Sequence, residues 1–213
     1  MKIFLFEIIV QINLYIVKIK LINLIKSGVG NIGSVARVLE DLETDYKIVE
    51  NNLDLNQSNK IILPGIGSFD SFIKSLKEKK LFNIIKSLVI DKKIPILGIC
   101  VGMQSFFKNS EEGEENGFGF FNSDCKKFES IKSKVPHLGW NNIKIEKESK
   151  LFNNLNNNMF YFAHSYYADT KDIAIKIGST NYGIEFTSVV NKENIFGVQF
   201  HPEKSSDQGI KII

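Results

Sequence analysis

The stretch from residue 94 to residue 104 constrains the fold more than any other part of the chain. Residues 94–99 are apolar throughout, and such a short run is typical of a strand buried on both faces at the centre of a parallel sheet. Cys100 follows at once between Gly98 and Gly102, and a helix-like segment begins after it. A strand, a tight turn and a helix in this order indicate an α/β fold with a reactive residue at the turn.

The rest of the first half alternates short apolar runs with helical stretches, which predicts a central, mostly parallel sheet flanked by helices. We expect strands at residues 18–25, 46–49 and 60–63, and helices at residues 32–42, 69–77 and 81–91. Glycine turns close two of these strands, at residues 28–31 and 64–67.

The second half has a different pattern. A loop rich in glycine and glutamate is followed by closely spaced β-type runs, which predict additional antiparallel strands, at residues 142–146, 159–163, 172–177, 184–190 and 195–200. No repeat or linker separates the halves, so we expect residues 18–213 to form a single domain. The last residues resemble the first turns of a closing helix, and a truncation at Ile213 stays open.

The first 17 residues are apolar but contain Lys2, Glu7, Gln11 and Asn13. A membrane span needs about 20 predominantly apolar residues, and no small-residue cleavage site of a signal peptide follows. We therefore expect residues 1–17 to be an over-extended start or a loose appendage.

Composition excludes several classes of protein. The chain has 213 residues, 43% of them hydrophobic, and a net charge of +3 without a basic cluster, so it reads as a globular chain that binds neither nucleic acid nor a membrane. Its two cysteines, Cys100 and Cys125, are expected to stay reduced in the cytoplasm. We predict no metal and no cofactor.

Cys100 is the candidate nucleophile. The flanking glycines fit a sharp strand-to-helix turn that lifts the sulfur out of the sheet, and the helix N-terminus favours a thiolate. The alternative is an ordinary buried core cysteine. Cys125 has no such glycines, and we expect it to be structural.

His201 is the candidate base and Glu203 the residue that orients it. A strand is expected to run to residue 200, and Pro202 keeps the residue before it, His201, extended. In an extended chain the side chains of positions 201 and 203 point the same way. A surface turn with an incidental His and Glu is the alternative. His164 is expected to bind substrate or to cap a strand, and His137 to be a hydrogen-bonded loop residue.

Several motifs carry a resemblance to a known family, namely residues 28–32, 64–69, 98–104, 135–141, 164–167, 180–183 and 199–204, in this order. Together they resemble the glutaminase subunits of imidazole glycerol phosphate synthase, which are class I, triad-type glutamine amidotransferases. The resemblance covers the chain from about residue 18 to its end. It implies a flavodoxin-like α/β fold.

The resemblance also implies roles for individual residues. Cys100 would form a γ-glutamyl thioester, His201 would act as base and then acid, and Glu203 would orient it. The oxyanion hole would use the loop of Gly65, Ile66 and Gly67 together with the Val101 N–H. Glutamine would be bound by Gly67, Gln104, Glu112, Ser165 and Tyr166, with Glu111 as the alternative to Glu112.

Relatives of this kind pass ammonia to a (β/α)₈-barrel synthase in a heterodimer, which yields imidazole glycerol phosphate and AICAR in histidine biosynthesis. Asn31, Trp140 and Lys204 match positions that face this partner, and ordinary surface positions are the alternative. Lys26 and Ser27 depart from the Asp-Tyr that is common before the first glycine, and the last helix is short. Paralogues that supply ammonia for acetamidino sugars in surface glycans are therefore an alternative.

Two other classes of protein, an α/β-hydrolase with a cysteine nucleophile and an inactive binding subunit, fit the sequence less well. In α/β-hydrolases the acid precedes the histidine, whereas here Glu203 follows His201. An inactive binding subunit would not need an intact Cys, His and Glu set.

Overall fold

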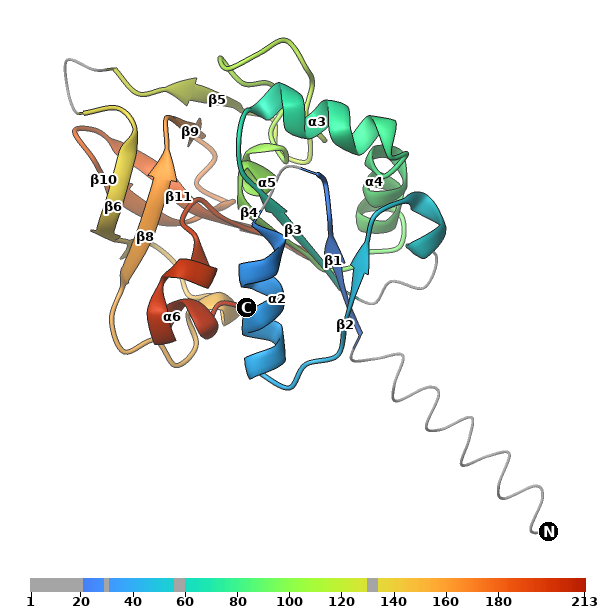
Figure 1. Ribbon diagram of the computed structural model, residues 1–213. Helices are drawn as coiled ribbons and strands as arrows, with labels where there is room; N and C mark the ends of the chain where they lie inside the picture. Colours follow the sequence, from blue (N-terminus) through green and yellow to red (C-terminus); the bar gives the residue numbers. More distant parts are fainter. Residues whose placement is uncertain (1–20, 29–30, 56–59, 130–133) are drawn as a thin grey trace.

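The computed structural model describes residues 21–28, 31–55, 60–129 and 134–213. The expected appendage at residues 1–17, the start of the strand expected at residues 18–25, and residues 29 and 30 of the first glycine turn lie outside these ranges (Figure 1).

Five parallel strands form the centre of the fold, in the spatial order β2, β1, β3, β4 and β12. Their bounds are Tyr46–Val49, Ile22–Ile25, Lys60–Gly65, Ile96–Cys100 and Ile195–Val198, respectively. Every residue of β1 and β4 is buried, as expected for strands covered on both faces. The parallel sheet predicted from the apolar runs is confirmed.

Antiparallel strands extend this sheet beyond β12. They are β11 (Glu185–Lys192), β10 (Lys176–Asn181) and β7 (Lys144–Ile145). Strand β9 (Tyr166–Asp169) pairs with β11, and β5 (Asp124–Lys127) pairs with β9. A separate two-stranded sheet pairs β6 (His137–Asn142) with β8 (Met159–His164). The prediction of antiparallel strands in the second half is confirmed.

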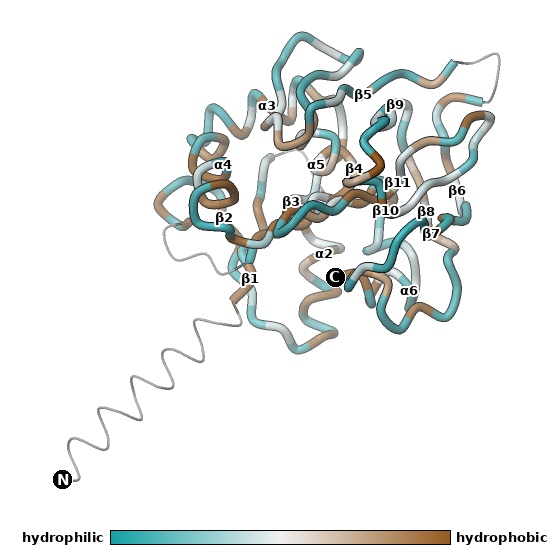
Figure 2. Tube along the Cα trace, turned by 180° about the vertical axis from the view of Figure 1, so that it is seen from behind, coloured by the Kyte–Doolittle hydropathy of each residue, from teal (hydrophilic) through white to brown (hydrophobic). Residues whose placement is uncertain are grey.

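Helices cover both faces of the sheet. In Figures 1 and 2, α3 (Phe69–Glu78) and α4 (Phe82–Ile90) lie on one side, and α2 (Ile32–Asp41) and α6 (Ser206–Ile210) lie on the other. The Ser68 hydroxyl caps α3 by accepting from the Ser71 N–H, and the helix buries Phe69, Phe72, Ile73 and Leu76 against the core. Short 3₁₀ turns lie at η1 (Asn52–Asp54), η2 (Lys150–Phe152) and η3 (Pro202–Lys204).

Several strand boundaries differ from the predictions. The strand expected at residues 172–177 begins at Lys176, because the Asp172 side chain accepts from the Ala174 N–H and holds the preceding residues in a turn. The run at residues 142–146 is divided between β6 and β7 at the buried Ile143. The last strand ends at Val198 and not at residue 200.

Strands β5 and β9, and residues 137–141 of β6, were not predicted. They alternate exposed and buried residues or lie half-exposed, so they lack the continuous apolar run of the central strands. Within the described part of the chain, no helix has the length and apolar character that crossing a membrane requires.

Candidate active site

Cys100 stands on a strained turn between β4 and α5 (Val101–Gln104). Its backbone has φ 54° and ψ −111°, a conformation that is rare for a residue with a side chain. A methyl group on Gly102 would lie 1.9 Å from the Leu63 carbonyl oxygen, and one on Gly98 would lie 2.6 Å from the Phe106 ring. The two glycines therefore allow the turn to pack directly against β3 and the core.

The helix predicted after Cys100 is a single turn. A helix macrodipole grows with aligned peptides, so its support for a thiolate is smaller here than the sequence led us to expect. Other contacts of the sulfur are correspondingly more important.

The imidazole of His201 is paired with the carboxylate of Glu203. His201 Nδ1 lies 2.8 Å from Glu203 Oε1, and the two side chains are only 3% and 2% exposed. His201 itself is extended, as expected, with φ −99° and ψ 95°. The chain does not stay extended to Glu203, because residues 202–204 form the 3₁₀ turn η3, in which the Lys204 N–H donates to the His201 carbonyl. The turn folds the carboxylate back onto the ring, so the predicted pairing exists by a different route.

The backbone of His201 is fixed on both sides. Its N–H donates to the Tyr161 carbonyl at 2.8 Å, and its carbonyl accepts from the Ser205 hydroxyl at 2.6 Å. Among the described residues no donor contacts the buried Oε2 atom of Glu203, so the bond from His201 is the described contact that offsets burial of this carboxylate.

The charge of the ring also depends on Cys100, the candidate nucleophile. Burial lowers the pKa of His201, but a hydrogen bond to the Cys100 side chain, the charge of its thiolate and the Glu203 carboxylate together raise the pKa to about 10. With Nδ1 engaged by Glu203, Nε2 is the ring atom available to the sulfur. Cys100, His201 and Glu203 thus form one connected unit.

A cavity of about 300 Å³ opens at this unit. Most of the predicted site residues line it, namely Ile66, Gly67, Cys100, Val101, Gln104, Glu112, Ser165, Tyr166, His201 and Lys204. Gly65 does not; it pairs with Cys100 in the sheet, and a methyl group on it would lie 2.6 Å from the Gly102 nitrogen. Gly67 has φ 82°, a conformation that favours glycine.

The two adjacent glutamates are separated by the fold. Glu112 lines the cavity and its Oε2 accepts from the Phe69 N–H at 2.8 Å, whereas Glu111 accepts from the Lys127 N–H on β5. Burial raises the pKa of Glu112, while the Phe69 N–H opposes this effect. Glu112 is therefore the glutamate available to a ligand.

His137 is not the loop residue we expected. It lies in β6, is 2% exposed, and stacks on Tyr182 with ring centroids 4.0 Å apart. His164, at the end of β8, lines the cavity, and its Nδ1 lies 2.7 Å from the Tyr166 carbonyl oxygen. Burial lowers the pKa of His137 to about 4 and that of His164 to about 3, so both rings are neutral at pH 7.

The residues expected at a partner interface lie in two places. Trp140 is half-exposed on β6, and Lys204 lines the cavity with its Nζ atom 5.8 Å from the centre of the Tyr161 ring. Asn31 lies outside this cavity, caps no N–H of α2, and donates to the Ser34 hydroxyl at 2.7 Å.

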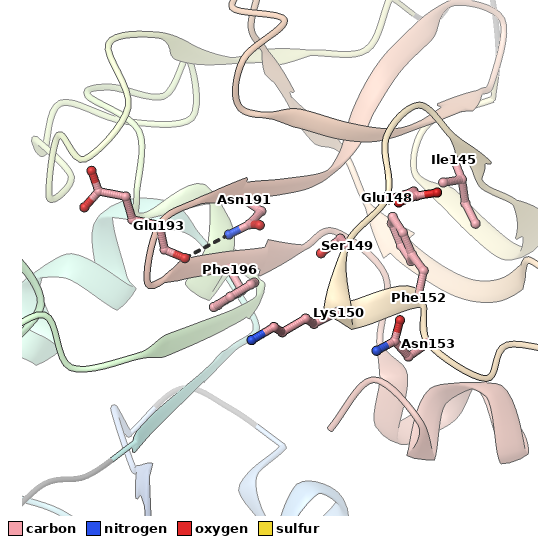
Figure 3. A pocket seen from close by; sticks show the side chains of 9 residues that line it. All are labelled: Ile145, Glu148, Ser149, Lys150, Phe152, Asn153, Asn191, Glu193 and Phe196. Atoms are coloured by element: carbon pink, nitrogen blue, oxygen red, sulfur yellow. Dashed lines mark hydrogen bonds between the residues drawn. The ribbon is translucent and has the colours of Figure 1, made fainter.

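A larger cavity of about 830 Å³ lies elsewhere (Figure 3). It is lined by Ile145, Glu148, Ser149, Lys150, Phe152, Asn153, Asn191, Glu193 and Phe196, with neither cysteine nor histidine among them. It adjoins the amino-terminal part of β12, whereas His201 follows the opposite end of that strand. The chemistry therefore assigns the site to the smaller cavity.

Sequence reasoning gave no role to Gln199, although this residue stands in the quoted motif. Its Nε2 atom lies 3.6 Å from Cys100 Sγ, and its side chain is fully buried. A polar residue two positions before the histidine was the available signal.

Comparisons with known proteins show which family the chain resembles. The imidazole glycerol phosphate synthase subunit HisH of Leptospira borgpetersenii is 44% identical over 198 residues, which cover 91% of this chain and 97% of that one. The subunit named HisH 2 of Methanococcus maripaludis is 44% identical over 195 residues, which cover 91% of this chain and 96% of that one. HisH 2 of Pseudomonas aeruginosa is 39% identical over 194 residues, which cover 90% of this chain and 96% of that one.

Solved structures share the fold at lower identity. PurLQS from Thermotoga maritima superposes with a TM-score of 0.71 at 19% identity, covering 91% of this chain and 95% of that one. A glutamine amidotransferase from the same organism gives a TM-score of 0.63 at 15% identity, with 89% and 79% covered. Residues 23–213 match the family described as glutamine amidotransferase class-I. The chain therefore belongs to the class-I glutamine amidotransferases and, within them, to the family of imidazole glycerol phosphate synthase HisH subunits.

Proposed function

We propose that this chain hydrolyses glutamine to glutamate and ammonia and delivers the ammonia to a (β/α)₈-barrel synthase subunit, which forms imidazole glycerol phosphate and AICAR in histidine biosynthesis. The observation that carries the proposal is the buried His201 ring, whose Nδ1 lies 2.8 Å from Glu203 Oε1 and which lines the same cavity as Cys100. The Cys100 side chain and Glu203 both raise the pKa of this ring. The names of the relatives agree with it.

The reaction uses the charge state of this unit. The Cys100 thiolate attacks the carboxamide carbon of glutamine, and the protonated His201 gives its proton to the departing nitrogen, which leaves as ammonia. The remaining γ-glutamyl thioester is attacked by water, whose proton returns to His201, and glutamate is released. Glu203 keeps Nδ1 protonated and offsets the charge of the ring throughout.

The negative oxygen of the tetrahedral intermediate needs hydrogen-bond donors. The Val101 N–H follows the nucleophile directly, and the loop of Gly65, Ile66 and Gly67 borders the sulfur from β3. Because Gly67 lacks a side chain and has positive φ, its peptide can turn toward the cavity.

The cavity fits a small amino acid. Its volume of about 300 Å³ is at the lower end of ligand sites. The half-buried Glu112 carboxylate suits the α-ammonium group of glutamine, while Gln104, Ser165 and Tyr166 surround the path from that carboxylate to the sulfur.

The partner would cover an apolar face beside the cavity mouth. Leu138, Trp140 and Met159 project from the outer face of β6 and β8, and are 63%, 50% and 44% exposed. Leu138 belongs both to this face and to the cavity lining, and Lys204, another lining residue, lies over the Tyr161 ring of β8. A protein docked here would therefore enclose the route by which ammonia leaves. Asn31 would contact the partner at its rim.

The buried, free cysteines fit a reducing compartment, and we assign the chain to the cytoplasm. The second candidate function uses the same glutaminase chemistry. In it a different partner transfers the ammonia to a nucleotide-linked sugar.

The test is a glutaminase assay on the purified chain with and without its co-purifying synthase partner. Wild type with the partner should release ammonia, and Cys100→Ala should lose hydrolysis while retaining the partner. Retained hydrolysis in Cys100→Ala would refute the triad. Transfer of ammonia to a sugar nucleotide but not to the histidine intermediate would favour the second candidate.

A further inference from the structure

Among the residues that the structure describes, two besides His201 place a polar atom near Cys100 Sγ. The Nε2 atom of Gln199 lies 3.6 Å away, and the Ala163 carbonyl oxygen lies 3.9 Å away. The carbonyl can only accept, so it suits the thiol form, in which S–H donates. The thiolate needs donors instead, and the Gln199 amide supplies one.

The orientation of the Gln199 amide follows from its neighbours. The Tyr166 carbonyl oxygen can only accept, so the Gln104 atom that lies 2.8 Å from it is the amide nitrogen, Nε2. The same nitrogen lies 3.0 Å from the side chain of Gln199, which must present its oxygen there. The other end of Gln199, which faces the sulfur, is therefore the NH₂ group.

The Tyr166 carbonyl is itself held by a second series of hydrogen bonds. The Nδ1–H group of His164 donates to it at 2.7 Å, which leaves Nε2 of this neutral ring to accept from His137 Nδ1 at 3.0 Å. His137 Nε2 then accepts from the Asn141 amide at 3.2 Å, and that amide also donates to the Asn181 carbonyl. Burial, which keeps both rings neutral, agrees with these tautomers.

The hydrogen bonds thus run without a break from Asn141 on β6 to the sulfur of Cys100. Each member is buried or half-buried, and each donor meets one acceptor, so rotation of any amide would leave a buried polar group unpaired.

We propose that Gln199 is a positioning residue for the nucleophile: its amide N–H stabilises the Cys100 thiolate, and the contact with Gln104 and the Tyr166 carbonyl fixes the amide in that orientation. The inference rests on the proposed function, because it assumes that Cys100 reacts as a thiolate. It adds a residue to the site that acts through Cys100 and not on the substrate.

The test is the pH dependence of alkylation of Cys100 by iodoacetamide in the full chain, followed by mass spectrometry of the peptide that contains Cys100. Cys125 is fully buried, and burial raises its pKa well above the usual value, so it gives little background. Gln199→Met removes the donor at similar length, and Gln199→Glu keeps the shape but presents acceptors. Each should raise the midpoint of alkylation by about one pH unit or more, a tenfold loss of thiolate near neutral pH.

Ser188→Ala is the matched control. Ser188 is fully buried, accepts a side-chain hydrogen bond from Thr180 at 2.9 Å, and its carbonyl accepts from the Gln199 N–H. No hydrogen bond joins its side chain to the sulfur of Cys100. It should cost stability yet keep the wild-type alkylation profile.

Two results would overturn the proposal: an unchanged midpoint in a folded Gln199→Met or Gln199→Glu protein, or an equal shift in Ser188→Ala. If one Gln199 variant does not fold, the other decides, and Gln104→Met, which frees the Gln199 amide to rotate, should give a smaller shift in the same direction. Alkylation needs no glutamine turnover, so an inactive wild type with the expected shifts would contradict the proposed function and leave this inference standing.

Discussion

His201 Nδ1 lies 2.8 Å from Glu203 Oε1 although a proline separates the two residues. The 3₁₀ turn that starts at Pro202 brings them together, and the pair is almost completely buried. The geometry of this pair determines which ring nitrogen carries the proton, and hence which nitrogen is available to Cys100 Sγ.

Glu203→Gln should lower kcat/KM for glutamine by roughly 10³–10⁴-fold, because an amide NH₂ facing Nδ1 selects the wrong tautomer. Steady-state kinetics of the complex with the synthase measures this effect. A loss below tenfold would mean that the carboxylate does not orient the ring.

Folding stability should depend on the ionisation of His201. Its pKa is raised to about 10 in the folded protein, against about 6.5 in the unfolded chain, so the stabilisation is complete below about pH 6.5 and is lost as the pH rises toward 10. Cys100→Ala removes one charge that raises this pKa, and it should reduce the alkaline loss. Urea midpoints at about pH 6.5, 8 and 9.5 test this, and identical slopes for both proteins would contradict it.

The buried pair of His137 and His164 should make the folding stability fall as the pH is lowered. The pKa of His137 is lowered to about 4 and that of His164 to about 3, so their contribution is complete above about pH 6.5 and is lost as the pH falls through these values. His137→Phe keeps a ring against Tyr182 and should cost about 1–3 kcal/mol at pH 7 by removing a buried hydrogen bond, yet lose less stability between pH 7 and 5. Urea unfolding at both pH values measures the two effects; an acid loss equal to that of wild type would exclude the pair as its source.

Gly102→Ala should destabilise the fold by at least about 3 kcal/mol, because the added methyl group would lie 1.9 Å from the Leu63 carbonyl. Gly33→Ala in α2 is the matched control, since nothing lies within 4 Å of its added methyl group. That change should raise stability by about 0.5–1 kcal/mol. Thermal unfolding of both variants tests the contrast, and similar melting temperatures would contradict it.

Trp140→Ala should weaken binding of the synthase subunit at least tenfold, because a half-exposed tryptophan beside the cavity mouth is a typical interface anchor. Ile173→Ala is the control, since Ile173 is 77% exposed and lies outside the proposed face. Calorimetric titration measures both affinities. Equal affinities for the two variants would move the interface away from β6.

The sequence predicted the parallel half of the fold well because strands such as β1 and β4 are buried on both faces and leave an uninterrupted apolar signal. It also predicted the sharp turn at Cys100 and the pairing of His201 with Glu203, because Gly98, Gly102 and Pro202 have backbone requirements that show in the residue type itself.

Prediction from the sequence failed where contacts between distant parts of the chain determine the structure. His137 follows Pro136 and precedes Gly139, which together suggest a turn, yet pairing with His164 across β8 makes it a strand residue. Glu111 and Glu112 cannot be told apart locally, because the contacts to Lys127 and Phe69 come from distant elements. Gln199 has no periodic or turn signature, and its role depends on a residue 99 positions earlier in the chain.

The anchor shared by Gln104 and His164 is the main-chain oxygen of residue 166 and not the tyrosine side chain. Exchange of that side chain therefore leaves both bonds in place. Position 166 borders the cavity, so a protein engineer who wishes to admit a longer or shorter amide can reshape the wall there while the alignment of the nucleophile is preserved.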